Sequence, residues 1–289
     1  MTRLWVRTPT IPSAPMSARL GRPVWLKLEN TQPVGSFKQR GMGLSCARAV
    51  ARGAEQLITS SGGNAGYAVA WAGRRLGVPV TVVVPSRTSP AMRERIEAEG
   101  AVVMVHGEVW DDAHAHAQTL PGALIHPFDH PDCWEGHATL VREIAEDGVQ
   151  PSVVVVAVGG GGLLTGVALG MADVGWSSVP IVAVETHGTA SLRAAVDAGE
   201  LVTLPAIDSV ALTLGARTVC RGALDVAQTR PLSSHTVSDE AALAAAARFD
   251  REHRMRVEPA CGAALAAVER GDLPGDGPVV VVVCGGAAA

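Results

Sequence analysis

Short runs of β-branched residues alternate along this chain with segments whose composition suits helices. Residues 78–84, 153–158 and 279–283 are almost continuously apolar, as is typical of strands buried on both faces of a parallel sheet. The helical segments 64–76 and 90–99 are each followed by glycine, a common helix terminator. This alternation predicts an α/β architecture with mainly parallel strands.

A closed (β/α)8 barrel has the same alternation and is the structural competitor. The spacing of the segments is uneven, however, and the two glycine-rich turns lie far apart, at 60–66 and 159–162. We therefore predict two open αβα units with parallel or mixed sheets. The large unit is expected to comprise residues 1–31 plus 135–289, and the small unit residues 32–134.

Composition excludes several classes of function. The 289 residues are 47% hydrophobic and carry a net charge of −4, so a large core is possible and no basic surface for nucleic acid or anionic membranes is expected. No apolar run approaches the roughly 18 residues of a membrane-spanning helix, and the N-terminus lacks a secretory signal. The five cysteines are widely spaced, which favours reduced thiols and a cytoplasmic location.

Only two of the 24 basic residues are lysines, Lys27 and Lys38. Arginine can replace lysine as a surface charge but not as an amine nucleophile, because the guanidinium stays protonated. Lys38 follows Phe37 at the start of a predicted helix, where burial and the helix N-terminus lower the pKa of an amine. We interpret Lys38 as a nucleophile able to form an imine. An exposed lysine on the helix is the alternative interpretation of Lys38. For Lys27, retention by chance explains the residue as well as a functional role does.

Four consecutive glycines at 159–162 join an apolar strand to a helix. Such a turn lets the backbone approach an anion, and the helix N-terminus offers free N–H groups. The sixth position of a dinucleotide G-x-G-x-x-G motif is Leu164 or Thr165 instead of glycine, and no P-loop Gly-Lys-Ser/Thr follows. A phosphate monoester therefore fits better than a nucleotide. A tight strand-to-helix turn is the alternative interpretation.

Two further loops carry candidate binding groups. The loop around Ser61 and Asn64 precedes a helix, and its hydroxyls and amides suit a carboxylate. Cys284 ends the valine run, where open α/β sheets bind ligands, and a thiol there suits a neutral ring nitrogen. An ordinary helix-capping loop and a buried structural cysteine are the respective alternatives. We assign no metal site to His114 and His116, because residues two apart point to different faces of a helix.

Together these motifs resemble the fold-type II pyridoxal-phosphate enzymes, whose architecture is like that of the tryptophan synthase β chain. The match is closest to the L-serine/L-threonine dehydratase (ammonia-lyase) family of the short, mammalian-liver type, and it extends over nearly the whole chain. The motifs that carry the resemblance are residues 27–30, 35–38, 134–137, 159–162, 258–263 and 284–286.

The resemblance implies pyridoxal 5'-phosphate as cofactor and Lys38 as the residue that binds it covalently and removes the substrate Cα proton. It implies these cofactor contacts: Phe37, Lys38, Asn64, Gly159, Gly160, Gly161, Gly162, Leu163 and Cys284. It implies these contacts to the amino-acid substrate: Ser61, Gly62, Asn64, Ala65 and Phe128. It also implies a monovalent cation such as K+ near these residues: Gly159, Glu185, Thr189, Leu214 and Ala216.

The implied reaction is deamination of L-serine or L-threonine to pyruvate or 2-oxobutyrate and ammonia, by a homodimer. At residue 62, racemases of this superfamily have Ser and the liver-type enzyme has Ala, so Gly62 predicts poor racemisation. The short C-terminus and the lack of an additional domain predict no allosteric control by isoleucine. Cysteine synthase-like β-replacement and a weakly active, cofactor-binding homologue remain alternatives.

Overall fold

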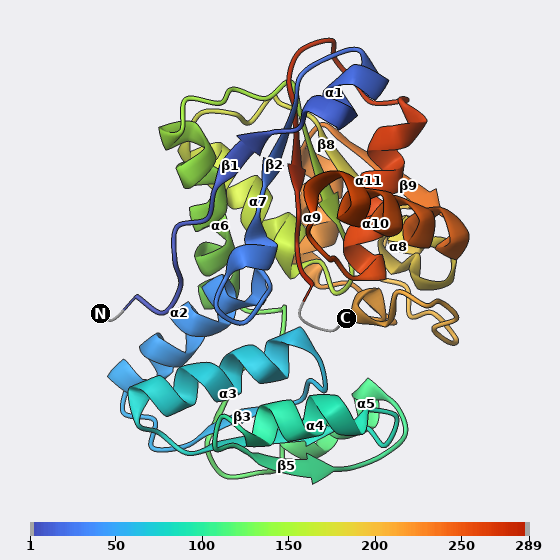
Figure 1. Cartoon of the computed structure of the whole chain (residues 1–289). Coiled ribbons are helices and arrows are strands. Elements are labelled where there is room, and N and C mark those ends of the chain that lie inside the picture. Colours follow the sequence, from blue (N-terminus) through green and yellow to red (C-terminus); the bar gives the residue numbers. More distant parts are fainter. Residues whose placement is uncertain (1–2, 287–289) are drawn as a thin grey trace.

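Two separate sheets frame the computed structural model, which describes residues 3–286. The larger sheet contains, in spatial order, β1 (Thr10–Pro12), β2 (Val24–Lys27), β10 (Val279–Val282), β7 (Val153–Ala157), β8 (Ile181–Thr186) and β9 (Leu232–Val237). The smaller contains β5 (Val102–Val105), β4 (Val80–Val84), β3 (Leu57–Thr59) and β6 (Ala123–Leu124). Figure 1 shows the smaller sheet below the larger one. The predicted α/β fold with two open sheets is confirmed, while the residue boundaries of the two units stay a prediction.

Helices cover both sheets. The larger sheet and the region between the sheets carry α1 (Ala14–Leu20), α2 (Lys38–Ala51), α6 (Pro131–Glu146), α7 (Gly162–Asp173), α8 (Ser191–Ala198), α9 (Arg221–Thr229), α10 (Asp239–His253) and α11 (Pro259–Arg270). The smaller sheet carries α3 (Asn64–Leu76), α4 (Pro90–Glu97) and α5 (Trp110–Ala117). Three short 3₁₀ turns are η1 (Glu29–Thr31), η2 (His187–Thr189) and η3 (Leu212–Leu214).

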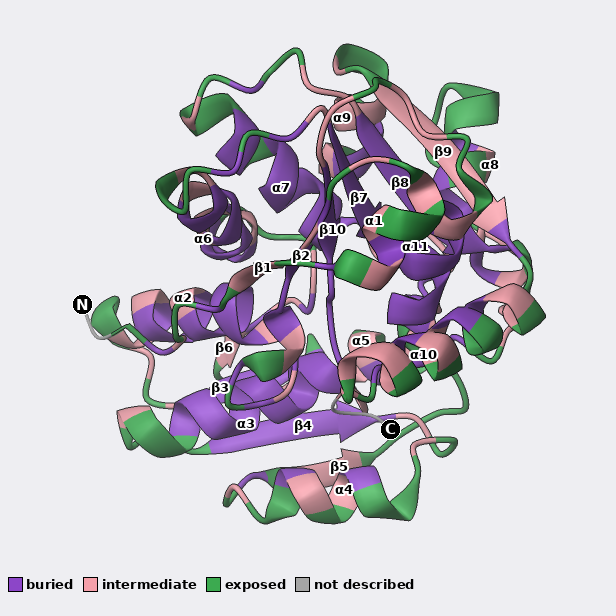
Figure 2. Ribbon diagram, turned by 45° about the horizontal axis from the view of Figure 1, so that its top comes forward, coloured by how far each residue is buried: buried purple, intermediate pink, exposed green. Residues whose placement is uncertain are grey.

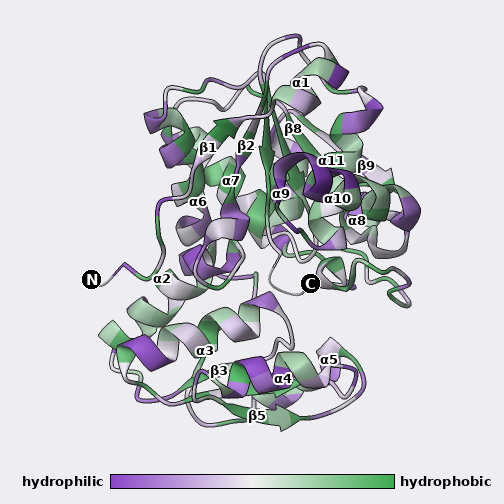
Figure 3. Cartoon of the chain, in the orientation of Figure 1, coloured by the Kyte–Doolittle hydropathy of each residue, from purple (hydrophilic) through white to green (hydrophobic). Residues whose placement is uncertain are grey.

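The core of the larger unit lies along its central strands. All residues of β10 and β7 are buried, and Figure 2 shows this buried centre enclosed by helices. Figure 3 shows apolar residues concentrated along the same strands. Strands covered on both faces have no solvent side, so a continuous valine run is stable there.

Parallel pairing places the loops that follow the strands at one edge of each sheet. Only β1 pairs antiparallel, with β2; every other pairing among the described strands is parallel. In the smaller sheet, the loops after β3, β4 and β6 therefore share one edge. In the larger sheet, the tetraglycine turn after β7 and Cys284 after β10 share another. Open α/β sheets bind ligands at such carboxyl edges.

Candidate active site

Lys38 begins α2 beside the end of β10. The Phe37 amide donates a hydrogen bond of 2.9 Å to the Cys284 carbonyl, and Ser36 forms an isolated antiparallel bridge with Gly285. These backbone contacts fix the first turn of α2 against the carboxyl edge of the larger sheet. The structure thus brings together Phe37, Lys38 and Cys284, which lie about 250 residues apart in the sequence.

The Lys38 amine points into the site. Its Nζ donates a 2.6 Å hydrogen bond to the Pro127 carbonyl and lies 5.2 Å from the Phe37 ring centroid. Burial lowers the pKa of Lys38, and the surrounding thiols and Glu258 only partly oppose that effect. A depressed pKa increases the fraction of neutral amine, which is the nucleophilic form.

The tetraglycine turn is packed so tightly that side chains do not fit. A Cβ on Gly160 would lie 2.4 Å from the Phe128 ring, and one on Gly162 would lie 2.5 Å from the Phe128 carbonyl oxygen. Gly161 has φ +89°, the left-handed region that favours glycine. Packing therefore gives a reason for these glycines even without a ligand, so the anion-binding interpretation needs support of another kind.

That support comes from unpartnered backbone donors. The turn leads into α7, whose N-cap Gly161 provides no side-chain cap. Within the described part of the chain, the amides of residues 160–163 donate no hydrogen bond. Free N–H groups at the start of a 12-residue helix form a site for an anion such as phosphate. The turn therefore fits the phosphate group of pyridoxal phosphate.

Asn64 and Glu258 form a buried pair that crosses between the units. Asn64 Nδ2 donates to Glu258 Oε1 and Oε2 at 3.0 and 3.2 Å, while Asn64 Oδ1 is buried without a partner. Burial raises the pKa of Glu258. The Glu258 amide bonds the Gly285 carbonyl at 3.1 Å, which brings this pair next to Cys284. The unpartnered oxygen of Asn64 is a further polar group available to a bound cofactor.

Cys284 is a buried, neutral thiol. Its hydrogen bond with Cys261, together with burial, raises its pKa well above the ordinary value. All five cysteines are free and buried. A neutral thiol is only a weak hydrogen-bonding group, which agrees with the predicted role of Cys284 beside a pyridine nitrogen.

The predicted substrate loop precedes α3. Ser61 Oγ accepts a hydrogen bond from the Gly63 amide at 3.3 Å, and Ala65 is buried in the first turn of the helix. A Cβ on Gly66 would lie 1.8 Å from the Ser61 carbonyl oxygen, so glycine is needed for the loop to pack on the helix. The loop adjoins the cofactor groups through Asn64.

Phe128 belongs to a cluster of four rings that the sequence did not indicate. Its ring lies 4.7 Å from His126, which lies 4.8 Å from His114, and Trp110 stacks on His114 at 4.7 Å. His114 Nδ1 is 2.8 Å from Ser60 Oγ, directly before the substrate loop. Burial, then the charges of His114 and Lys38, lower the pKa of His126 to about 3.

His114 and His116 do lie on different sides of α5. His116 stacks on His106, with 4.2 Å between the ring centroids, whereas His114 belongs to the cluster that contains Phe128. His114 therefore contacts the site's surroundings, a role that its local sequence did not indicate. The spacing of Trp110 and His114, one helical turn apart, was the available signal.

Three of the residues predicted to hold a cation, Gly159, Leu214 and Ala216, lie together at the phosphate turn. A Cβ on Gly159 would lie 3.0 Å from Leu214 Cα, and the Ala216 amide bonds the Leu214 carbonyl at 2.8 Å. Both carboxylate oxygens of Glu185 accept hydrogen bonds from the first amides of α8, at 2.7 and 2.9 Å. Burial raises the pKa of Glu185 to about 7. Glu185 thus has a helix-capping role that is independent of any cation.

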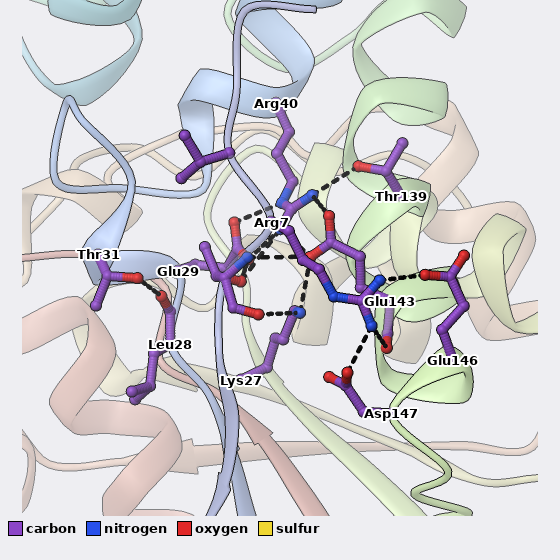
Figure 4. Close-up of polar contacts among 12 residues, drawn as sticks. Arg7, Lys27, Leu28, Glu29, Thr31, Arg40, Thr139, Glu143, Glu146 and Asp147 are labelled. Carbon is purple, nitrogen blue, oxygen red and sulfur yellow. Dashed lines mark hydrogen bonds and ion pairs between the residues drawn. The ribbon is translucent and has the colours of Figure 1, made fainter.

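A buried ionic network anchors α2 to the larger unit (Figure 4). Arg40 donates to both carboxylate oxygens of Glu29, at 2.7 and 2.8 Å, and of Glu143, at 2.7 and 2.8 Å. Lys27 Nζ reaches Glu143 at 2.8 Å and the Thr8 carbonyl at 2.8 Å. Lys27 is fully buried, so this second lysine has a structural role.

A cavity of about 610 Å³ lies between the end of α2 and β6, and Lys38 is not among its lining residues. Ser45, Arg52, Gly122 and His130 are among its lining residues, and none of the predicted cofactor contacts is. The functional site is therefore identified by its chemistry and its position at the sheet edges, not by cavity size.

The fold and the site define a pyridoxal-phosphate enzyme, and the chain belongs to that family: the family model "Pyridoxal-phosphate dependent enzyme" matches residues 1–285. Among its relatives, "Serine dehydratase-like" of Mus musculus is 50% identical over 96% of this chain and 89% of its own length. "L-serine dehydratase/L-threonine deaminase" of Homo sapiens is 46% identical over 98% of this chain and 91% of its own length. The solved structure of a fungal L-serine ammonia-lyase from Rhizomucor miehei has a TM-score of 0.92 at 36% identity, covering 99% of this chain and 95% of its own.

These comparisons confirm the predicted family, its fold and its cofactor, pyridoxal phosphate. Among the described residues, no helix is long and apolar enough to cross a membrane.

Proposed function

We propose that this enzyme deaminates L-serine and L-threonine, giving pyruvate or 2-oxobutyrate and ammonia. The observation that carries the proposal is the half-buried Lys38 amine, whose pKa is lowered and which lies between the Phe37 ring and the Pro127 carbonyl. The names of the relatives, serine dehydratase and serine ammonia-lyase, support the choice of substrate. The β-hydroxyl is lost as water and water later enters to release ammonia, so the atoms balance.

The cofactor, when bound, stabilises negative charge that develops at the substrate Cα. Lys38 Nζ would hold the cofactor covalently and would accept the substrate Cα proton. The amides of residues 160–163 at the start of α7 would bind the phosphate. Phe37 would pack beside the ring, and Asn64 would bind the ring hydroxyl.

The neutral Cys284 thiol would lie at the ring nitrogen of the bound cofactor and would provide no strong acid there, which would suit loss of the β-substituent. The substrate carboxylate binds Ser61, Asn64 and the amides around Ala65. Gly62 offers no side-chain proton donor, so racemisation through this residue is expected to be poor.

Three finer features belong to the same proposal. A monovalent cation such as K+ binds near Gly159, Glu185, Thr189, Leu214 and Ala216. The enzyme works as a homodimer, and it works in the cytoplasm. Support for the cation is the close approach of Gly159 to Leu214, and support for the cytoplasm is that all five thiols are free.

The test is an assay of keto acid and ammonia with L-serine and L-threonine. Equal amounts of both products are expected, and Lys38→Ala should abolish them together with the visible absorbance of the covalently bound cofactor. Lys38→Arg is the matched control, because it keeps the charge but not the nucleophile. Product formation by Lys38→Ala would refute the role of this amine.

The β-replacement alternative predicts a different product. Adding sulfide would then divert serine from pyruvate to cysteine, whereas deamination predicts unchanged pyruvate. A cofactor-bound chain that releases no ammonia from any hydroxy amino acid would instead be a binding homologue without this activity.

A further inference from the structure

The space beside Gly62 is filled by a side chain from the neighbouring loop. If residue 62 had a Cβ, that atom would lie 2.1 Å from Thr88 Oγ1, 2.8 Å from Thr88 Cγ2 and 3.0 Å from Thr88 Cβ. Thr88 lies between β4 and α4, and its amide donates to the Pro85 carbonyl at 3.0 Å, which fixes the turn. The Thr88 hydroxyl therefore occupies the position where a side chain at residue 62 would begin.

This position belongs to the substrate site. β3 and β4 are parallel neighbours, so the loops that contain Gly62 and Thr88 follow them at the same carboxyl edge. Asn64, two residues after Gly62, reaches across to Glu258 of the larger unit. The Gly62 loop therefore faces the larger sheet, and Thr88 lies at the margin of the site next to it.

The Thr88 hydroxyl is free to bind a ligand. It makes no hydrogen bond within the part of the chain that the structure describes, and the residue is half-buried. By contrast, the nearby Ser61 hydroxyl accepts a hydrogen bond from the backbone amide of Gly63. The side-chain amide of Asn64 donates to Glu258. The Thr88 hydroxyl can both donate and accept a hydrogen bond, so it suits a neutral hydroxyl group of the ligand. A carboxylate only accepts, and the loop amides can bind it.

We propose that Thr88 is a specificity-determining residue, which hydrogen-bonds the β-hydroxyl of the substrate and limits the space beside Gly62 to small side chains. This inference rests on the proposed deamination of hydroxy amino acids. The substrate class is accordingly small β-hydroxy amino acids. Alanine, which has no hydroxyl, cannot form this hydrogen bond.

The contact itself is tested by a double-mutant cycle of Gly62→Ala and Thr88→Ala. The melting temperature of the full chain is measured with and without cofactor. Gly62→Ala alone should lower it, because the new Cβ displaces the Thr88 side chain. The double variant should regain at least about half of that loss in melting temperature. Substitutions at residues in contact have coupled effects on stability, whereas the effects of distant substitutions add. Additive effects would overturn the contact.

The hydroxyl is tested by binding in a Lys38→Ala background, where serine is not consumed. Calorimetry compares the Kd values of L-serine and L-alanine with and without Thr88→Val, which removes the hydroxyl at nearly constant shape. Serine binding should weaken about threefold to tenfold, the usual value of one hydrogen bond, and alanine binding should stay within about twofold. Thr88→Ser is the matched control and should retain serine binding. Equal effects on both ligands, or no effect on either, would overturn the proposal.

The active enzyme provides a second readout. Thr88→Val should raise KM for serine more than it lowers kcat, because the hydrogen bond is made to the ground state as well as during the reaction. A fall in kcat alone contradicts this. If the native chain forms no keto acid from serine or threonine, the proposed function fails, while the melting cycle still decides whether Thr88 fills the space at Gly62.

Discussion

Replacing Arg40 by methionine should destabilise the protein strongly, because it leaves a buried carboxylate without its cation. Lys27 and Arg40 balance Glu29 and Glu143 one for one, and all four are buried. In the variant, Glu143 keeps Lys27 at 2.8 Å. Glu29 keeps only neutral partners, among them the Thr8 hydroxyl at 2.6 Å. The uncompensated charge therefore falls on Glu29, which is fully buried.

Breaking a buried pair by removing one partner typically costs about 3–5 kcal/mol. We expect that loss in the free energy of unfolding, measured by urea titration of the cofactor-free chain. For a protein of this size it corresponds to a fall in Tm of roughly 6–15 °C. A second variant, Arg40→Met/Glu29→Gln, restores neutrality and should recover at least about half of the loss.

The contribution of the native network to stability depends on pH through Glu143. Burial acts to raise the pKa of Glu143, but Arg40 and Lys27 outweigh it and lower that pKa. Its contribution is present above the ordinary value of 4.5 and is lost as pH falls below it.

The contribution of Glu143 should therefore be present throughout pH 5.5 to pH 8, and the deficit is measured within that range. A loss under about 1 kcal/mol, the value typical of exposed ion pairs, would refute the reasoning. So would a double variant no more stable than Arg40→Met, since the charge on Glu29 would then not be the cause. A conservative Arg40→Lys variant should fall between, because lysine cannot bridge both carboxylates.

Three further predictions concern the site. Because burial lowers the pKa of Lys38, cofactor-free protein should bind pyridoxal phosphate covalently at a rate that levels off below pH 10.5, the amine's ordinary pKa; stopped-flow absorbance showing a rise up to that pH contradicts this. Gly160→Ala places a Cβ 2.4 Å from the Phe128 ring, and this overpacking should weaken cofactor binding about tenfold. Adding Phe128→Leu should restore part of the affinity, and fluorescence titration measures cofactor binding by both variants. Exchanging K+ for a large organic cation should lower turnover in the native chain and have less effect in Glu185→Gln, and unchanged turnover argues against the cation site.

The sequence was sufficient where structure depends on local chain properties. The helix 64–76 was predicted with the bounds that α3 has, because Gly77 takes the left-handed C-cap that ends it. The start of α5, Trp110–Ala117, could not be placed in the same way. It is set by Asp112 Oδ2, which accepts from the Glu108 and Val109 amides at 3.0 and 3.3 Å. That hydrogen bond depends on side-chain geometry, which apolar patterning does not report.

The same distinction applies to the site. Lys38 and the tetraglycine turn could be found because each has an unusual local composition. Glu258 stands out in the sequence only as part of the motif at 258–263, although its carboxylate pairs with Asn64, 194 residues away. Thr88 depends on the position of Gly62 in three dimensions, and nothing in its own loop distinguishes it. Contacts of this kind follow from strand order, which no single stretch of sequence specifies.

The position of Lys38 follows from charge as well as from chain folding. Arg40 lies two residues further along α2 and is bound by η1 through Glu29 and by α6 through Glu143. A shift of α2 relative to the larger sheet must break these buried charged hydrogen bonds. The free-energy cost of breaking them is well above the thermal energy. Movements of the smaller sheet that preserve the network must therefore leave α2 and its lysine in place.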